Sequence, residues 1–210
     1  MSIPYTTEIR PDTGLTNPKL GIWLFLASEV MLFGSLFSAY ALLRSGDPSW
    51  PDQSAVVNVP LATLNTVVLI SSSVTMVLAW AALARRHMGP TPADAVTEAQ
   101  QIRRYRVFMG LTLLLGAVFL GIKAIEYGGK LADGLLPATN NFLGLYFTMT
   151  GLHALHVVGG MIVNAYLLGP GVRMWARDPQ RFANRVEVSG IYWHFVDVIW
   201  IFLFPVLYLL

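Results

Sequence analysis

The stretch at residues 190–210 constrains the fold most, because it is long enough to cross a bilayer yet carries two ionisable side chains. A membrane-spanning helix needs about 20 mostly apolar residues. His194 and Asp197 lie inside this run at i and i+3, so they share one face of the helix. An unpaired charge at that depth costs roughly 3 kcal/mol or more. The stretch therefore predicts a membrane helix in which two polar groups need partners.

The composition of the whole chain is typical of a membrane protein. Of its 210 residues, 55% are hydrophobic and 12% are charged, whereas soluble domains carry about 25% charged residues. Cysteine is absent, which excludes disulfides, thiolate metal sites and a cysteine nucleophile. Residues 1–19 are polar and lack the apolar core of a signal peptide, so we expect the first hydrophobic segment to be a retained anchor.

Five segments are long and apolar enough to span a membrane, at about 20–43, 60–84, 107–127, 142–168 and 188–210. The connections between them are polar, and several are rich in turn-forming residues. No internal repeat is evident. We therefore predict an all-α fold, with a single membrane domain over residues 1–210 that forms a five-helix bundle.

The basic residues predict how this bundle is oriented. Most of them precede the first segment or lie in the second and fourth connections, while the other side has Arg44 and Lys130, with Lys123 near the end of the third segment. The positive-inside rule then places the N-terminus in the cytoplasm and the C-terminus outside. The residues on the cytoplasmic side are Arg10, Lys19, Arg85, Arg86, Arg103, Arg104, Arg106, Arg173, Arg177, Arg181 and Arg185.

Two further patterns concern packing. Small or polar residues four apart allow helices to approach closely in lipid, and aromatic residues near segment ends, such as Tyr208, are expected at the membrane interface. The pairs with this spacing are Gly34 with Ser38, Ala117 with Gly121, and Gly160 with Asn164.

Ionisable residues inside the predicted spans are the candidate functional residues. At 1.5 Å of rise per residue, the predicted topology places most of them in a layer roughly a dozen Å thick. They could satisfy one another and fix the order of the helices. Alternatively Glu29, a carboxyl group removed from water, takes part in proton handling. The full set is Glu29, Lys123, Glu126, His153, His156, His194 and Asp197.

Two other arrangements stay open at this point. Three histidines, or two histidines with a carboxylate, have ligand types that could hold a metal ion. Lys123 and Glu126 are i, i+3 neighbours near the outer end of the third segment, where we expect a partly solvated ion pair.

Four motifs resemble subunit III of the haem–copper terminal oxidases, in the right order along the chain. The most specific are Gly-Ile-Tyr-Trp-His-Phe-Val-Asp-Val-Ile-Trp at 190–200 and Thr-Gly-Leu-His-Ala-Leu-His-Val-Val-Gly at 150–159. Leu-Ala-Ser-Glu-Val-Met-Leu-Phe at 26–33 and Ala-Ile-Glu-Tyr at 124–127 support them. The resemblance covers essentially all five predicted helices.

The resemblance implies a non-catalytic subunit of a proton-pumping oxidase in the bacterial plasma membrane. Such a subunit packs mainly on subunit I, with subunit II also in the complex, and leaves haem and copper to those partners. It supports proton uptake from the cytoplasm and protects the enzyme during turnover. Glu29 matches the family's buried, carbodiimide-reactive carboxylate. The other matching polar positions, which the resemblance makes structural rather than metal-binding, are His153, His156, His194, Asp197 and Glu126.

The resemblance also raises the question of lipid. Seven-helix members hold phospholipid in a cleft whose first arm is formed by two helices that this chain lacks, because it begins at what resembles the third helix. Another subunit would then supply that arm. Arg173 lies near a lipid-contacting arginine of the family, which makes phospholipid a candidate ligand.

Alternatives remain for the function. Within the same class, the chain resembles subunits of quinol oxidases and of some nitric oxide reductases. A different class is an independent proton-coupled transporter that uses Glu29, Asp197 and the histidines, although a chain without repeats does not match inverted-repeat designs. Membrane lipids are expected partners and nucleic acid is not.

Overall fold

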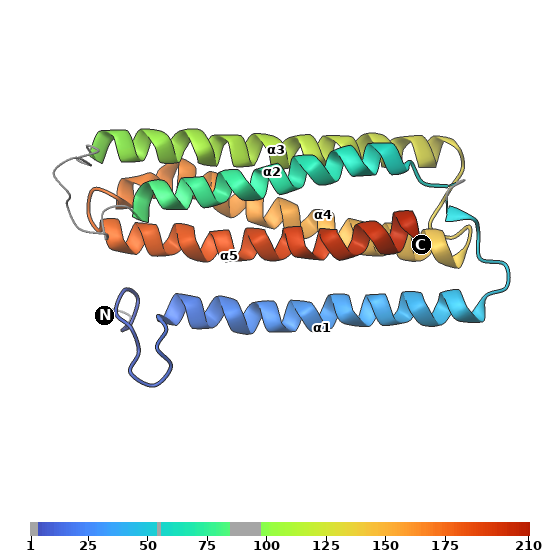
Figure 1. Cartoon of the computed structure of the whole chain (residues 1–210), viewed down its shortest axis with the longest axis horizontal. Helices are drawn as coiled ribbons and strands as arrows, with labels where there is room; N and C mark the ends of the chain where they lie inside the picture. Colours follow the sequence, from blue (N-terminus) through green and yellow to red (C-terminus); the bar gives the residue numbers. More distant parts are fainter. Residues whose placement is uncertain (1–3, 54–55, 85–97) are drawn as a thin grey trace.

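The computed structural model, which describes residues 4–53, 56–84 and 98–210, contains five long helices that lie side by side (Figure 1). They are α1 (Asn17–Gly46), α2 (Val59–Ala84), α3 (Glu98–Ala132), α4 (Asn141–Leu168) and α5 (Pro179–Phe204). All five are long and apolar enough to cross a membrane, which confirms the predicted all-α membrane fold. Arg85 and Arg86, which contribute to the predicted topology, lie outside the described residues.

The helices extend beyond the apolar segments that predict them. α3 begins at Glu98 rather than near 107, and α5 begins at Pro179 rather than near 188. The side chain of Asp178 caps α5 by accepting a hydrogen bond from the backbone N–H of Arg181 at 3.0 Å, and Pro179 follows at the first helical position. Hydropathy marks the part of a helix that suits lipid, whereas capping marks where the helix begins.

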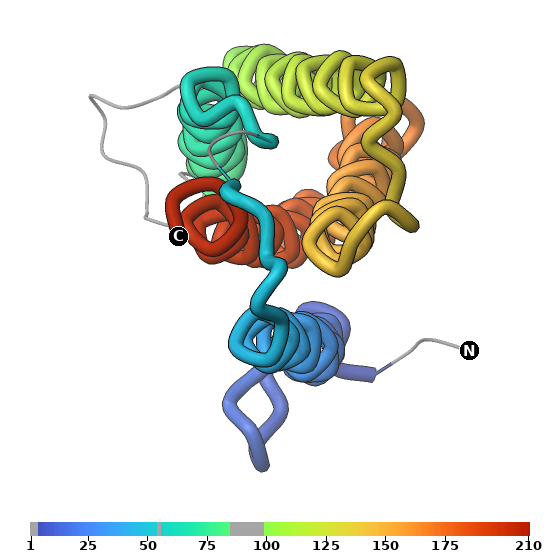
Figure 2. Tube along the Cα trace, turned by 90° about the vertical axis from the view of Figure 1, so that its right-hand side faces the viewer, coloured from blue at the N-terminus to red at the C-terminus, as the bar shows by residue number. Residues whose placement is uncertain are grey.

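Helices α2 to α5 form a ring around a common core, and α1 lies outside this ring against α4 and α5 (Figure 2). Ion pairs and hydrogen bonds hold α1 at both ends. Near its start, Lys19 pairs with Glu187 of α5 at 2.7 Å. Near its end, Arg44 donates to the backbone carbonyl of Leu210 at 2.5 Å. α1 is thus a peripheral helix with specific attachments.

The connection that follows α1 is fixed to the start of α4 by Asp47. Its carboxylate accepts hydrogen bonds from the hydroxyl and the backbone N–H of Ser49, at 2.5 and 2.9 Å, and from the amide of Asn141 at 3.2 Å. These bonds, with that of the Ser49 side chain the strongest, lower the pKa of Asp47 below its ordinary value.

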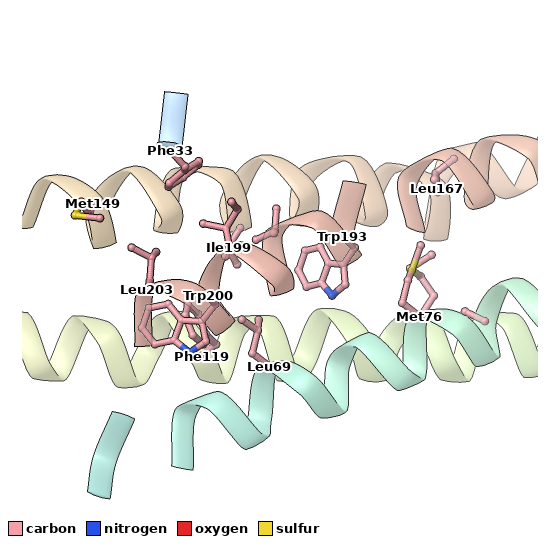
Figure 3. Packing of buried hydrophobic residues seen from close by; sticks show 14 of the residues in the cluster. Phe33, Leu69, Met76, Phe119, Met149, Leu167, Trp193, Ile199, Trp200 and Leu203 are labelled. Carbon is pink, nitrogen blue, oxygen red and sulfur yellow. The ribbon is translucent and has the colours of Figure 1, made fainter. Parts of the chain in front are cut away.

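Two tryptophans of α5 fill the core of the ring (Figure 3). Their indole N–H groups are both satisfied by α2, since Trp193 donates to Ser72 at 3.1 Å and Trp200 donates to Thr66 at 2.9 Å. Trp193 also lies directly on Gly160 of α4, where a Cβ atom would come within 2.8 Å of its ring. The predicted close approach at Gly160 is therefore confirmed.

The other predicted small-residue contacts do not form within the described chain. No atom lies within 4 Å of where a Cβ would stand on Gly34 or Gly121, so these glycines face away from the bundle. Gly116, which was not among the predicted pairs, instead lies under Trp193, where a Cβ atom would come within 3.1 Å of the indole ring. The spacing of small residues identifies candidate sites of close helix contact, but the position of a large side chain on the neighbouring helix determines which of these sites form a contact.

The last helical turn changes type at Pro205. Proline has no N–H to continue the α-helical ladder, and the chain closes a π turn, η4 (Pro205–Leu209), in which the Leu210 N–H donates to the Pro205 carbonyl at 3.1 Å. Tyr208 lies within this wider turn and points into the bundle, where it is 2% exposed. Tyr208 therefore faces the interior of the bundle rather than lipid, and its position at the depth of the membrane interface stays a prediction.

Candidate functional site

Glu29 and His156 form the polar contact between α1 and the ring. The carboxyl Oε2 of Glu29 lies 3.0 Å from Nε2 of His156, and each side chain is 14% exposed. Glu29 lies roughly 18 Å along α1 from Asn17, and His156 lies near the middle of α4. Phe33 of α1 covers the imidazole edge-on, at 5.4 Å between ring centroids. The pair is therefore largely enclosed by protein, near the middle of both helices.

The geometry of this pair requires one proton between the carboxyl group and the imidazole. Nδ1 of His156 lies 2.8 Å from the backbone carbonyl of Leu152, and because a carbonyl only accepts, Nδ1 carries a hydrogen. A bare Nε2 and an ionised Glu29 carboxylate would both be acceptors, so one further proton lies between them. The pair is either a carboxylic acid beside a neutral imidazole or a carboxylate beside an imidazolium.

His153 lies one turn from His156 but in a different environment. It is buried in the ring, and neither of its ring nitrogens has a hydrogen-bond partner among the described residues. Its imidazole packs against Phe119 and Trp200, with centroid distances of 5.7 and 5.1 Å. Within this chain His153 contributes packing, and the structure does not bring it into contact with Glu29.

His194 and Asp197 lie together on the side of the ring where α5 meets α2. Nδ1 of His194 is 2.6 Å from the hydroxyl of Ser73 on α2 and 3.9 Å from Oδ2 of Asp197. The Asp197 side chain is 6% exposed, while that of His194 is 39% exposed. Their partner outside α5 is Ser73 of α2, whereas Glu29 pairs with His156 of α4, so they form a second polar group and do not join Glu29.

Lys123 and Glu126 form a third polar group, nearer the outer end of α3. Their ion pair, at 2.8 Å, is buried with side chains 5% and 4% exposed, so the expectation of partial solvation is wrong. The Lys123 ammonium also donates to the hydroxyls of Tyr146 and Tyr208, at 3.1 and 2.7 Å. Both hydroxyls in turn donate to Glu126, at 2.6 and 3.0 Å. Every donor of the ammonium is used.

Aromatic rings surround the same ammonium on several sides. The Lys123 nitrogen lies 5.2–5.4 Å from the ring centroids of Tyr127, Tyr146, Trp200 and Tyr208, distances at which cation–π attraction operates. We call Lys123, Glu126 and these four rings the Lys123 cage. The sequence did not identify Tyr146 and Tyr208 as partners of Lys123. The only signal in the sequence was a charged residue, Lys123, within an apolar segment, where it needs partners.

The remaining candidates are placed apart from these groups. Arg173 lies in the 3-10 turn η3 (Pro170–Met174) between α4 and α5, where it is exposed. In the part of the chain that the structure describes, no three His, Asp or Glu side chains lie close enough together to hold one metal ion.

Comparison with known proteins assigns the family. The family described as cytochrome c oxidase subunit III matches residues 12–210. The chain belongs to this family. It is 38% identical to cytochrome c oxidase subunit 3 of Thermostichus vulcanus, over 97% of this chain and 94% of that relative. It is 32% identical both to cytochrome c oxidase subunit 3 of Bacillus sp. (strain PS3) and to cytochrome bo(3) ubiquinol oxidase subunit 3 of Pseudomonas aeruginosa, over 92% of this chain and 86% and 85% of those relatives.

Membership of the subunit III family sets the context for the polar groups. The chain is a multi-pass membrane protein and a subunit III of a haem–copper oxidase, which associates with other oxidase subunits in a complex. The alternative of an independent transporter is not favoured, because relatives that align over nearly the whole chain are oxidase subunits.

Proposed function

We propose that this subunit III is non-catalytic, packs on subunit I in the bacterial plasma membrane, and supports proton uptake through Glu29 and His156. Haem and copper would belong to the partner subunits. The observation that carries the proposal is the 3.0 Å contact between Oε2 of Glu29 and Nε2 of His156, which requires one proton between the two atoms. Burial of a carboxyl group inside a membrane costs free energy, and the attachment of one helix does not require it. A site that holds one exchangeable proton could instead serve a neighbouring proton-pumping enzyme.

Substitution of Glu29 tests this role in the intact oxidase. Glu29→Ala removes both the attachment of α1 and the shared proton. Glu29→Gln keeps a side chain that can donate to Nε2 of His156 but cannot ionise. If the proton matters, both variants should show slower turnover or faster inactivation during turnover, with normal haem content. Oxygen consumption over successive turnovers and the haem absorption spectrum provide the measurements.

A purely structural role gives a different result for the same two variants. Glu29→Gln would then behave like the unsubstituted oxidase, and Glu29→Ala would reduce only the retention of this subunit in the purified complex. That outcome would contradict the proposed support of proton uptake while leaving the assignment to the oxidase intact.

The electron donor is proposed to be cytochrome c. The name of the Thermostichus relative, at 38% identity, supports this choice, while the Pseudomonas relative at 32% is a ubiquinol oxidase subunit. The purified complex should oxidise reduced cytochrome c and not ubiquinol. Oxidation of ubiquinol alone would contradict the proposal.

A phospholipid is proposed to bind beside α1. A groove of about 540 Å³ lies between α1, α4 and α5, with apolar walls that include Phe25 and Val163. Arg185 lines this groove and also an adjoining one of about 210 Å³ that contains Arg181. The first groove suits an acyl chain, and two guanidinium groups suit a phosphate. Arg173, the lipid contact suggested by the family resemblance, lines neither groove.

Lipid analysis of the purified complex tests this placement. Arg181→Ala combined with Arg185→Ala should remove a tightly bound phospholipid that native mass spectrometry detects. Arg173→Ala is the matched control, because it removes a guanidinium from the same connection but from neither groove. Loss of lipid only with Arg173→Ala would contradict the proposal.

A further inference from the structure

The imidazole of His153 is buried inside the ring of helices without a polar partner. The residue is 1% exposed, and neither Nδ1 nor Nε2 has a hydrogen-bond partner in the part of the chain that the structure describes. A neutral imidazole carries one N–H donor and one acceptor nitrogen. Buried polar atoms in proteins nearly always have a partner, which is either another protein atom or an ordered water molecule. The packing of His153 against aromatic rings therefore leaves its two nitrogen atoms unexplained.

Asn65 of α2 brings a further unpaired polar atom into the ring. It is 0% exposed and lies on the buried face of α2 that also includes Leu69 and Ser72. Its amide Nδ2 donates to the backbone carbonyl of Phe119 at 3.3 Å. Because a carbonyl only accepts, the amide nitrogen must face it, and Oδ1 is directed elsewhere. Oδ1 has no hydrogen-bond partner among the described residues, so Asn65 needs a donor.

His153 and Asn65 lie at the same level of the ring, on helices that face each other across it (Figure 2). Phe119 of α3 adjoins both, since its carbonyl accepts from Asn65 and its ring packs edge-on against His153, at 5.7 Å between centroids. Trp200 also adjoins both sides. Its ring lies 5.1 Å from that of His153, and its N–H donates to Thr66, the neighbour of Asn65 in sequence. The unpaired atoms of α2 and α4 thus belong to one layer, between the same two aromatic side chains.

The burial and charge of this layer limit what can satisfy these atoms. At 1% and 0% exposure, His153 and Asn65 are out of reach of lipid and of any helix of another subunit. A cation is disfavoured, because the Lys123 ammonium lies 5.3 Å from the centroid of the same Trp200 ring that His153 contacts. The partner must also donate to Asn65, which a metal ion cannot do. Water is small enough to be enclosed and can both donate and accept.

We propose that the ring encloses an internal water site at this level, in which an ordered water molecule donates to Oδ1 of Asn65 and is hydrogen-bonded to a ring nitrogen of His153. Buried waters typically make about three hydrogen bonds to polar groups that would otherwise be unpaired. This water connects α2 with α4 across the ring and gives His153 a polar role as well as a packing role. The site is independent of the proposed proton uptake, because it includes neither Glu29 nor a residue of subunit I.

A cryo-electron microscopy map of the purified oxidase, at a resolution that shows ordered waters elsewhere in the buried interior of the complex, tests the site directly. We expect density for a water molecule within about 3.2 Å of both Oδ1 of Asn65 and a ring nitrogen of His153. A map that resolves other buried waters but none at His153 would overturn the proposal. Density at about 2.1 Å from a nitrogen of His153 would indicate a metal ion and would also overturn it.

A double-mutant cycle tests whether the two side chains share the water. His153→Phe keeps a flat ring without nitrogen atoms, and Asn65→Leu replaces the carboxamide with an apolar group of similar size. Each single variant leaves the remaining side chain and the water with one partner fewer, so each should lower the melting temperature of the subunit in detergent. The double variant removes both polar partners. Its loss in melting temperature should therefore be clearly smaller than the sum of the two single losses.

The matched control combines Asn65→Leu with Tyr105→Phe. Tyr105 is also fully buried, but it lies on α3 roughly 21 Å along the helix from Phe119, too far to share a water with Asn65. The losses of this pair should add. The bond from Asn65 to Phe119 is lost in both cycles, so it does not affect the comparison. Additive losses for His153 and Asn65 as well would overturn the shared water, and the map of the unsubstituted complex decides the matter if a variant does not fold.

Discussion

At the scale of single residues, Lys123 shows how a membrane helix accommodates a charge. Its ammonium is neutralised by Glu126, fully hydrogen-bonded and enclosed by aromatic rings. Lys123→Met would leave the Glu126 carboxylate buried without its counter-charge. Breaking a buried pair in this way typically costs about 3 kcal/mol or more. We expect the free energy of unfolding of the subunit in detergent to fall by about that amount, measured by denaturant titration.

The double variant is the control for this prediction. Combining Lys123→Met with Glu126→Gln removes both charges, so no uncompensated carboxylate remains in the Lys123 cage. The double variant should be more stable than Lys123→Met alone. If the single variant were as stable as the double, the ion pair would not be the reason that Lys123 is tolerated in the membrane.

The same residues show what sequence could and could not predict about the site. Residue type and depth identify Glu29 and His156, because both lie near the middle of apolar segments. Their pairing depends on α1 packing beside α4, which a single sequence does not specify. Tyr208 joins the Lys123 cage only because the turn at Pro205 directs it inward, and hydropathy carries no information on that turn.

At the scale of the elements, the close packing of α4 on α5 depends on Gly160. A Cβ there would lie 2.8 Å from Cε3 of Trp193, a rigid and fully buried ring that also donates to Ser72. Gly160→Ala should therefore destabilise the subunit by about 1–3 kcal/mol, the usual cost of overpacking a core. Gly121→Ala is the matched control, because nothing lies within 4 Å of its Cβ position. It should be neutral or stabilising, by up to about 1 kcal/mol of helix propensity.

Thermal unfolding of the two variants in the same detergent decides this prediction. Equal melting temperatures would mean that α4 can shift away from Trp193 at little cost.

The sequence predicts the number and order of the helices well, because each span must be apolar over a length set by the bilayer. It predicts their contacts less well, because exposure to lipid and burial in protein both favour apolar residues.

At the scale of the whole molecule, the arginines that follow α4 lie at the same end of the bundle as the start of α1, and the end of α5 lies at the other (Figure 1). Because the chain has no cysteine, single cysteines can report the orientation without background. Asp133→Cys, after α3, should react with a membrane-impermeant maleimide in spheroplasts. Gln180→Cys, at the start of α5, should react only after permeabilisation.

The orientation decides whether the proposed role of Glu29 is physically reasonable. With the N-terminus in the cytoplasm, the carboxyl group lies roughly 18 Å along α1 from its cytoplasmic end, which is the side from which protons are taken up in the proposed function. The opposite labelling pattern would place the start of α1 and the arginines after α4 outside. Glu29 would then be nearer the outer surface, and the shared proton of Glu29 and His156 could not serve uptake from the cytoplasm.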